Sequence, residues 1–306
     1  MLPFQLVYHP RYDLNLGEHV FPARKYRLIH DRLIEEQFAQ QSDFVEPQRV
    51  SDDDVLRVHE SGWVNRLKTG TLTEPEIVKL EIPYSREMVE GFWLATGGTI
   101  LAARNALRDR IGFNIGGGFH HAFPDHGEGF CAINDIAIAI RALQHDHVIE
   151  RVLVVDCDVH HGNGTAAIFA GDKSVLTLSL HQFNNYPSEK PPSTLDVNLP
   201  DGVEDAEYLD RLGGALKVAM SFSPHLLLYV AGADPYREDQ LGGLAMTIDG
   251  LKRRDRLVFE TARAQSVPVA VVLAGGYARD TDDTVTIHCN TAEAARAAVV
   301  QESRKP

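Results

Sequence analysis

The chain has 306 residues, 44% of them hydrophobic and 24% charged, and its 43 acidic and 30 basic side chains give a net charge of −13. This balance argues against a nucleic-acid backbone or an anionic membrane surface as the partner. An acidic surface suits a cationic substrate, or it serves solubility alone. We find no apolar run of the roughly 18–20 residues that span a bilayer, and no secretory signal at the N-terminus. The three widely spaced cysteines are typical of reduced thiols, so we expect a cytoplasmic protein.

Short apolar runs alternate with helix-length segments along the chain. The strand candidates are Gln5–His9, Arg151–Asp156, Val175–Leu180, Leu226–Ala231 and Pro268–Ala274. The helical patterns lie near Arg24–Gln41, Arg86–Arg110, Ile133–Gln144, Ala206–Met220, Ile248–Ala264 and Thr291–Glu302. Strands that alternate with helices predict βαβ units. We therefore expect one α/β domain over residues 1–306, with an open, mostly parallel sheet covered by helices on both faces.

Two adjacent histidines, His120 and His121, follow a glycine triplet in the segment NIGGGFHHAF. Glycines let the backbone approach another group closely, and imidazole is the usual general base in enzymes. A lone histidine is more often a buried core residue, but the adjacent pair favours a catalytic role. Each ring needs a partner that fixes its tautomer, and Asp156 and Asn163 are the candidates.

The segment VLVVDCDVHHGNGT places acidic and imidazole side chains just after a buried strand. Side chains alternate along an extended segment, so Asp156, Asp158 and His160 project to the same side. The oxygen and nitrogen donors of Asp158 and His160 suit Zn²⁺, and also Fe²⁺ or Co²⁺. A catalytic zinc site needs a third protein ligand, and Asp234, after the strand LLLYVA, is the best-placed carboxylate. The alternative is a capping and turn network, since Asp and Asn are common at strand ends.

The last of these segments is LAGGYARD, in which Gly275 and Gly276 place Tyr277 on a tight turn after another apolar strand. A phenol at this position can donate a hydrogen bond to a developing oxyanion, although a purely structural tyrosine is the alternative. Ligands of open parallel sheets bind beyond the carboxyl ends of the strands. The segments DCDVHHGNG, LHQF, GADPY and AGGY each follow a predicted strand, so we expect them to converge at that edge.

The motifs GGGFHHA, GFCAIND, VDCDVHHGNGT, LSLHQF, GADPY and AGGY occur in the order and spacing of histone-deacetylase-like enzymes of the arginase/deacetylase fold. The chain resembles these enzymes from about Tyr8 to Thr284, and most closely the class IV deacetylases and their bacterial relatives. The resemblance implies a zinc-dependent hydrolase that removes an acetyl or longer acyl group from an N-acyl-lysine side chain of a protein or peptide.

The resemblance also implies a role for each motif residue. Asp158, His160 and Asp234 match the metal ligands. His121 matches the general base, and later acid, and Asn163 matches the residue that orients it. His120, paired with Asp156, matches the electrostatic neighbour of the base. Tyr277 matches the residue that polarises the scissile carbonyl. Substrate contacts fall on Gly129, Phe130, Tyr186, Gly275 and Gly276. A structural K⁺ is implied at Asp156, Asp158, His160, Ser179 and Leu180.

Two positions depart from the family pattern. Asn163 is neutral, so it can orient His121 but cannot stabilise an imidazolium as a carboxylate would, and we expect the histidine pair to titrate lower than with two Asp partners. Ile82, with Glu81 beside it, stands where many relatives carry a rim Asp that grips a peptide. This second departure leaves room for small or long-chain acylated amines as substrates.

Three alternatives compete with the deacylase hypothesis: an acetylpolyamine amidohydrolase, a non-catalytic acyl-lysine binder and a two-manganese ureohydrolase. The third needs additional bridging carboxylates, which His161, Gly162 and Asn163 do not supply. The sequence leaves the acyl chain, the physiological metal and the oligomeric state open.

Overall fold

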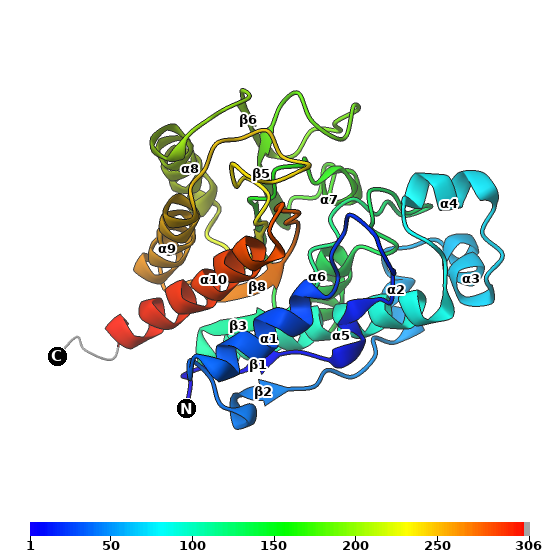
Figure 1. Cartoon of the computed structure of the whole chain (residues 1–306), viewed down its shortest axis with the longest axis horizontal. Coiled ribbons are helices and arrows are strands. Elements are labelled where there is room, and N and C mark those ends of the chain that lie inside the picture. Colours follow the sequence, from blue (N-terminus) through cyan, green and yellow to red (C-terminus); the bar gives the residue numbers. More distant parts are fainter. Residues whose placement is uncertain (303–306) are drawn as a thin grey trace.

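The apolar runs of the chain form a single parallel sheet in the computed structural model, which describes residues 1–302 (Figure 1). The eight strands are β1 (Leu6–Val7), β2 (Phe44–Val45), β3 (Ile111–Asn114), β4 (Val152–Asp156), β5 (Val175–Gln182), β6 (Leu195–Leu199), β7 (Leu226–Ala231) and β8 (Val269–Leu273). Their order across the sheet is β2-β1-β3-β8-β7-β4-β5-β6, and every neighbouring pair is parallel. The predicted parallel α/β sheet is therefore confirmed.

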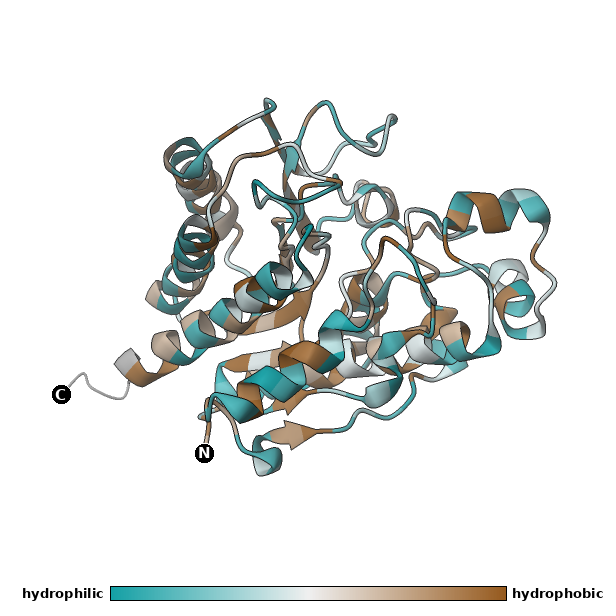
Figure 2. Ribbon diagram, viewed as in Figure 1, coloured by the Kyte–Doolittle hydropathy of each residue, from teal (hydrophilic) through white to brown (hydrophobic). Residues whose placement is uncertain are grey.

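The central strands are apolar on both faces because each face packs against a layer of helices. In β4, Val152 and Val154 belong to one core, and Leu153 and Val155 belong to the other. In Figure 2, brown segments gather toward the interior near β3 and β8, and the surrounding helices carry teal turns among brown and pale ones. This two-faced burial confirms the prediction that helices cover both sides of the sheet.

The helices divide between the two faces. The chain forms α1 (Lys25–Glu35), α2 (Asp52–Val55), α3 (Ser61–Thr69), α4 (Glu74–Leu80), α5 (Arg86–Asp109), α6 (Asp135–His145), α7 (Asn163–Ile168), α8 (Asp205–Ala219), α9 (Ile248–Ala264) and α10 (Thr281–Glu302). Ala103 and Ala106 of α5 and Ile136, Ile140 and Leu143 of α6 pack in the core that contains Val152. Apolar residues of α1, α8, α9 and α10 pack in the core that contains Leu153.

Several elements differ from the sequence-based expectation. The strands β2, β3 and β6 and the helices α2, α3, α4 and α7 were not predicted, and β1 covers only part of Gln5–His9. Helix α1 ends at Glu35 rather than Gln41, and α10 begins at Thr281 rather than Thr291. Short elements carry too few residues to show a period, and β3 exists because β1 and β8 pair with its two edges.

Two further findings concern membrane-spanning helices and the cysteine thiols. Within residues 1–302, no helix has the length and hydropathy needed to cross a membrane. The thiols Cys131, Cys157 and Cys289 are free and buried. Burial raises the pKa of Cys157 to about 12, which makes it a poor nucleophile.

The stability of the sheet core can be tested at Leu228 on β7, which is 0% exposed and belongs to the same hydrophobic core as Val152. Replacing Leu228 with Ala leaves a cavity, so Leu228→Ala should lower the free energy of unfolding by about 2–5 kcal/mol. Urea denaturation measures this change. The control Val78→Ala, at a side chain that is 69% exposed, should change it by less than about 0.5 kcal/mol. A Leu228→Ala protein that unfolds at the wild-type urea concentration would contradict the core assignment.

Candidate metal centre and active site

Three buried side chains meet where β4 and β7 end. Asp158 and His160 follow β4, and Asp234 follows β7. The two strands are neighbours, with Asp156 paired to Val230, so their carboxyl ends lie side by side. One ligand atom from each of the three residues lies within 4.8 Å of the other two. The sheet therefore brings the predicted ligands Asp158, His160 and Asp234 together.

Backbone amides fix the two carboxylates of this group. Asp158 Oδ2 accepts a hydrogen bond from Gly275 N at 2.8 Å, and Asp234 Oδ1 accepts one from Val159 N at 2.9 Å. A Cβ atom at Gly275 would collide with Asp234 Oδ2. The Gly-Gly turn after β8 is thus a close approach of the backbone to the ligand carboxylates, which only glycine permits.

The donors of this group fit a divalent cation. His160 Nδ1 lies 3.0 Å from Asp158 Oδ1 and 3.4 Å from Asp234 Oδ2, and Asp234 Oδ2 is buried without a hydrogen-bond partner. Burial and the charge of Asp158 raise the pKa of Asp234 to about 7. Two buried carboxylates need positive charge to compensate them, and an O, N, O donor set suits Zn²⁺, Fe²⁺ or Co²⁺.

The two adjacent histidines lie beside this group, each with a different partner. His120 Nδ1 contacts Asp156 Oδ2 at 2.6 Å, and His121 Nδ1 contacts Asn163 Oδ1 at 2.7 Å. Their Nε2 atoms are 3.0 Å apart, a distance that requires a hydrogen between them. Burial lowers the pKa of His120, but the carboxylates of Asp156 and Asp158 outweigh it and raise that pKa to about 9.

The surroundings of His121 lower its pKa rather than raise it. Burial and the positive charge of His120 hold the pKa of His121 well below 6.5. The surroundings therefore favour the charged form of His120 and the neutral form of His121, and a general base must be neutral to accept a proton.

The loop that carries the two histidines is held by the buried carboxylate of Asp135, which was not among the predicted site residues. Asp135 accepts hydrogen bonds from Gly118 N at 3.0 Å, Phe119 N at 2.7 Å and Thr99 Oγ1 at 2.6 Å. Asp135 is the first residue of α6, and the available signal was its place at the end of the GFCAIND motif. Its role could not be read from the sequence because its partners lie 16 to 36 residues away.

A cavity of about 170 Å³ lies beside the histidine pair and the predicted metal ligands. Its lining residues are Glu81, His121, Gly129, Phe130, His160, Asn185, Tyr186, Leu241 and Tyr277. The Tyr277 ring centroid is 6.3 Å from that of His160, and Tyr277 N donates to Asp239 Oδ2 at 2.6 Å. A predicted metal ligand, an imidazole and a phenol thus line the same cavity.

The walls of this cavity include a tight turn at Gly129 and Phe130. Both residues have positive φ, 52° and 67°, and a Cβ at Gly129 would lie 2.8 Å from His121 Cδ2. Glycine at 129 therefore keeps the wall close to the imidazole, and the strained Phe130 presents its ring to the cavity. Of the predicted substrate contacts, Gly129, Phe130 and Tyr186 line this cavity, and Gly275 lines a smaller one beside it. Gly276 packs instead against Thr284 and Ala233.

The two rim positions singled out in the sequence, Glu81 and Ile82, lie in different surroundings. Ile82 is 2% exposed and belongs to the hydrophobic core, so it cannot grip a peptide backbone. Glu81 lines the cavity instead, and burial and the charge of Glu128 raise its pKa.

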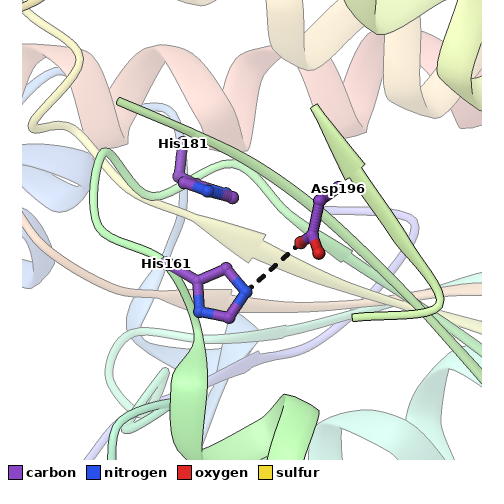
Figure 3. Close-up of side chains that lie close together, drawn as sticks. All are labelled: His161, His181 and Asp196. Carbon is purple, nitrogen blue, oxygen red and sulfur yellow. Dashed lines mark hydrogen bonds and ion pairs between the residues drawn. The ribbon is translucent and has the colours of Figure 1, made fainter. Parts of the chain in front are cut away.

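A second group of potential metal ligands consists of His161, His181 and Asp196, which lie close together in Figure 3. His161 Nε2 is 3.2 Å from Asp196 Oδ1 and 3.2 Å from Ser193 Oγ, and the rings of His161 and His181 are 4.6 Å apart. The Asp196 side chain is 24% exposed, and none of the three ligands lines the cavity. We assign this group a structural role, because its contacts tie edge strand β6 to the loop that carries His160.

Comparison with known proteins gives consistent matches over nearly the whole chain. The histone deacetylase domain model matches residues 19–292. An uncharacterized protein of Picosynechococcus sp. is 43% identical over 96% of this chain and 98% of its own length, and Histone deacetylase 2 of Arabidopsis thaliana is 33% identical over 89% and 74%. The crystal structure of the HDA15 HD domain superposes with a TM-score of 0.79 at 26% identity, covering 98% of this chain and 91% of that chain.

The ligand assignment can be tested by metal analysis. Asp158→Ala and Asp234→Ala each remove one of three protein ligands, so metal content after dialysis should fall from about one ion per chain to near zero. Inductively coupled plasma mass spectrometry measures it. The matched control Asp196→Ala removes the carboxylate of the second group and should keep the wild-type metal content. Full metal content in Asp234→Ala, or loss of metal in Asp196→Ala, would show that the wrong group was chosen.

Proposed function

Because this chain belongs to the histone deacetylase family, a family of hydrolytic deacetylases, we propose that it removes an acyl group from the N-acyl-lysine side chain of a protein or peptide. The observation that carries the proposal is the cavity in which His160, His121 and Tyr277 meet. An acylated amine that enters it would place its carbonyl between the metal ligands and the phenol.

The residues of the site divide the reaction between them. A divalent cation, Zn²⁺ in our proposal, held by Asp158, His160 and Asp234 would polarise the carbonyl and lower the pKa of water. His121 takes a proton from the attacking water, and the Tyr277 hydroxyl donates a hydrogen bond to the oxyanion. His121 or His120 then protonates the leaving nitrogen, so that amide and water become carboxylate and amine.

A structural K⁺ is a further part of the proposal. Its predicted ligands are Asp156, Asp158, His160, Ser179 and Leu180. The register of the sheet sets Asp156 of β4 directly opposite Ser179 of β5, which supports a shared site between these strands. The ion would hold the loop of Asp158 and His160 against β5.

Small acylated amines are the second candidate substrates. Ile82 is buried and unavailable to a peptide, whereas Glu81 places a carboxylate at the cavity that would attract a cationic amine chain. Acetylpolyamines need no peptide contact at position 82, and their cationic amine chain would be attracted by the Glu81 carboxylate.

A substrate panel separates the two candidates. We expect the metal-quantified protein to cleave acetyl-, decanoyl- or myristoyl-lysine peptides faster than acetylputrescine or acetylspermidine, and a chelator to abolish the reaction. Release of free amine measures the rates. Faster cleavage of the polyamines would favour small acylated amines as the substrates. Bound metal without turnover on any of these compounds would contradict both proposed substrate classes.

The role of Tyr277 can be tested by removing its hydroxyl. Tyr277→Phe should lower kcat by about 10²–10³-fold, the range for loss of one oxyanion donor, while metal content stays at the wild-type level. The control is Tyr84→Phe, whose hydroxyl bonds Leu67 O outside the cavity and whose loss should leave kcat unchanged. A Tyr277→Phe enzyme that turns over at the full rate would remove the tyrosine from the mechanism.

A further inference from the structure

A buried carboxylate stands behind Asn163, on the side opposite His121. Glu128 is 7% exposed, and its Oε1 accepts hydrogen bonds from Asn163 Nδ2 at 2.6 Å and from Tyr186 Oη at 3.1 Å. Its Oε2 lies 3.0 Å from Lys79 Nζ and 3.1 Å from His126 Nε2. Burial raises the pKa of Glu128, but the bonds from His126 and Lys79 outweigh this and lower it to about 2. The carboxylate is therefore ionised and accepts only.

This carboxylate decides which way the Asn163 amide points. The two ends of an amide are a donor and an acceptor, and only the NH₂ end can face an ionised carboxylate. With Nδ2 turned to Glu128, Asn163 Oδ1 must face His121 Nδ1. Because Oδ1 only accepts, His121 must carry its hydrogen on Nδ1, which leaves Nε2 as the basic nitrogen.

The opposite orientation would disable the base. Without an acceptor behind it, Asn163 can exchange Oδ1 and Nδ2 at almost no cost in packing, because the two ends have nearly the same shape. Its NH₂ group would then face His121 and favour the tautomer with the hydrogen on Nε2. His120 Nε2, 3.0 Å from His121 Nε2, favours the same tautomer from the other side of the ring. A neutral asparagine reinforces it only if a third group fixes the amide of the asparagine, whereas an aspartate at 163 would need no such group.

We propose that Glu128 is a positioning residue that acts through Asn163 to keep the hydrogen of His121 on Nδ1. The kinetic consequence rests on the proposed function, but the tautomer itself does not. Glu128 is missing from the predicted site because its spacing from Asn163, 35 residues, carries no local signal.

The kinetic test uses neutralisation and rescue. Glutamine at 128 keeps the size but lets its own amide turn, so Glu128→Gln should lower kcat about 10- to 100-fold, the range for loss of an outer partner of a catalytic imidazole. Adding Asn163→Asp to Glu128→Gln should restore most of the loss, because an aspartate accepts at both oxygens. A purely structural Glu128 would not be rescued in this way. Asp172→Asn, which neutralises a carboxylate held by Arg141 and Ser174, is the control and should leave kcat unchanged.

A second measurement does not need turnover. In the metal-loaded protein with ¹⁵N-labelled histidines, the His121 resonances, identified by their absence in His121→Ala, should show the hydrogen on Nδ1 in the wild type. They should show it moved to or shared with Nε2 in Glu128→Gln. Wild-type kcat or a wild-type His121 tautomer in Glu128→Gln would overturn the proposal. If no substrate is cleaved by the wild type, the proposed function fails and the tautomer still decides the role of Glu128.

Discussion

The site depends on one constraint: two carboxylates are buried together at the adjacent ends of β4 and β7, away from the water that would otherwise stabilise their charge. The sheet imposes this proximity, since Asp158 and Asp234 follow strands that pair directly. Backbone amides of Gly275 and Val159 offset part of the charge. The oxygen Oδ2 of Asp234 is buried without a hydrogen-bond partner, so the compensation is incomplete, and the proposed divalent cation would complete it.

A buried guanidinium, that of Arg254, bonds to both loops that carry the ligand carboxylates. Arg254, on α9, is 0% exposed, and its Nη1 donates to Gly232 O at 2.6 Å and to Cys157 O at 3.3 Å. These two carbonyls belong to the loops that carry Asp234 and Asp158. Arg254 is itself oriented by Asp255, which accepts from its Nε at 2.9 Å. Helix α9 thus contributes one side chain that bonds to both ligand loops.

The sequence predicted the parts of the molecule that local pattern controls. The apolar runs of β4, β7 and β8 and the motifs after them follow from strand periodicity and the edge at which parallel strands end. The pairing of His120 with Asp156 came instead from the resemblance to the deacetylase family. The contributions of Asp135, Glu128 and Arg254 could not be predicted, because each acts on a backbone or side chain far away in sequence. The short strands β2, β3 and β6 were missed for a related reason, since a few residues become a strand only when neighbours supply the other half of the hydrogen bonds.

The most direct test of the account is a metal titration of the metal-free protein, with hydrolysis of an acyl-lysine peptide as the readout. The account predicts no activity without metal, a linear rise as Zn²⁺ is added, and saturation at about one ion per chain, as three protein ligands and one open position require. Full activity in the metal-free protein would contradict the central claim. Saturation only at two ions would contradict the one-metal site built on Asp158, His160 and Asp234.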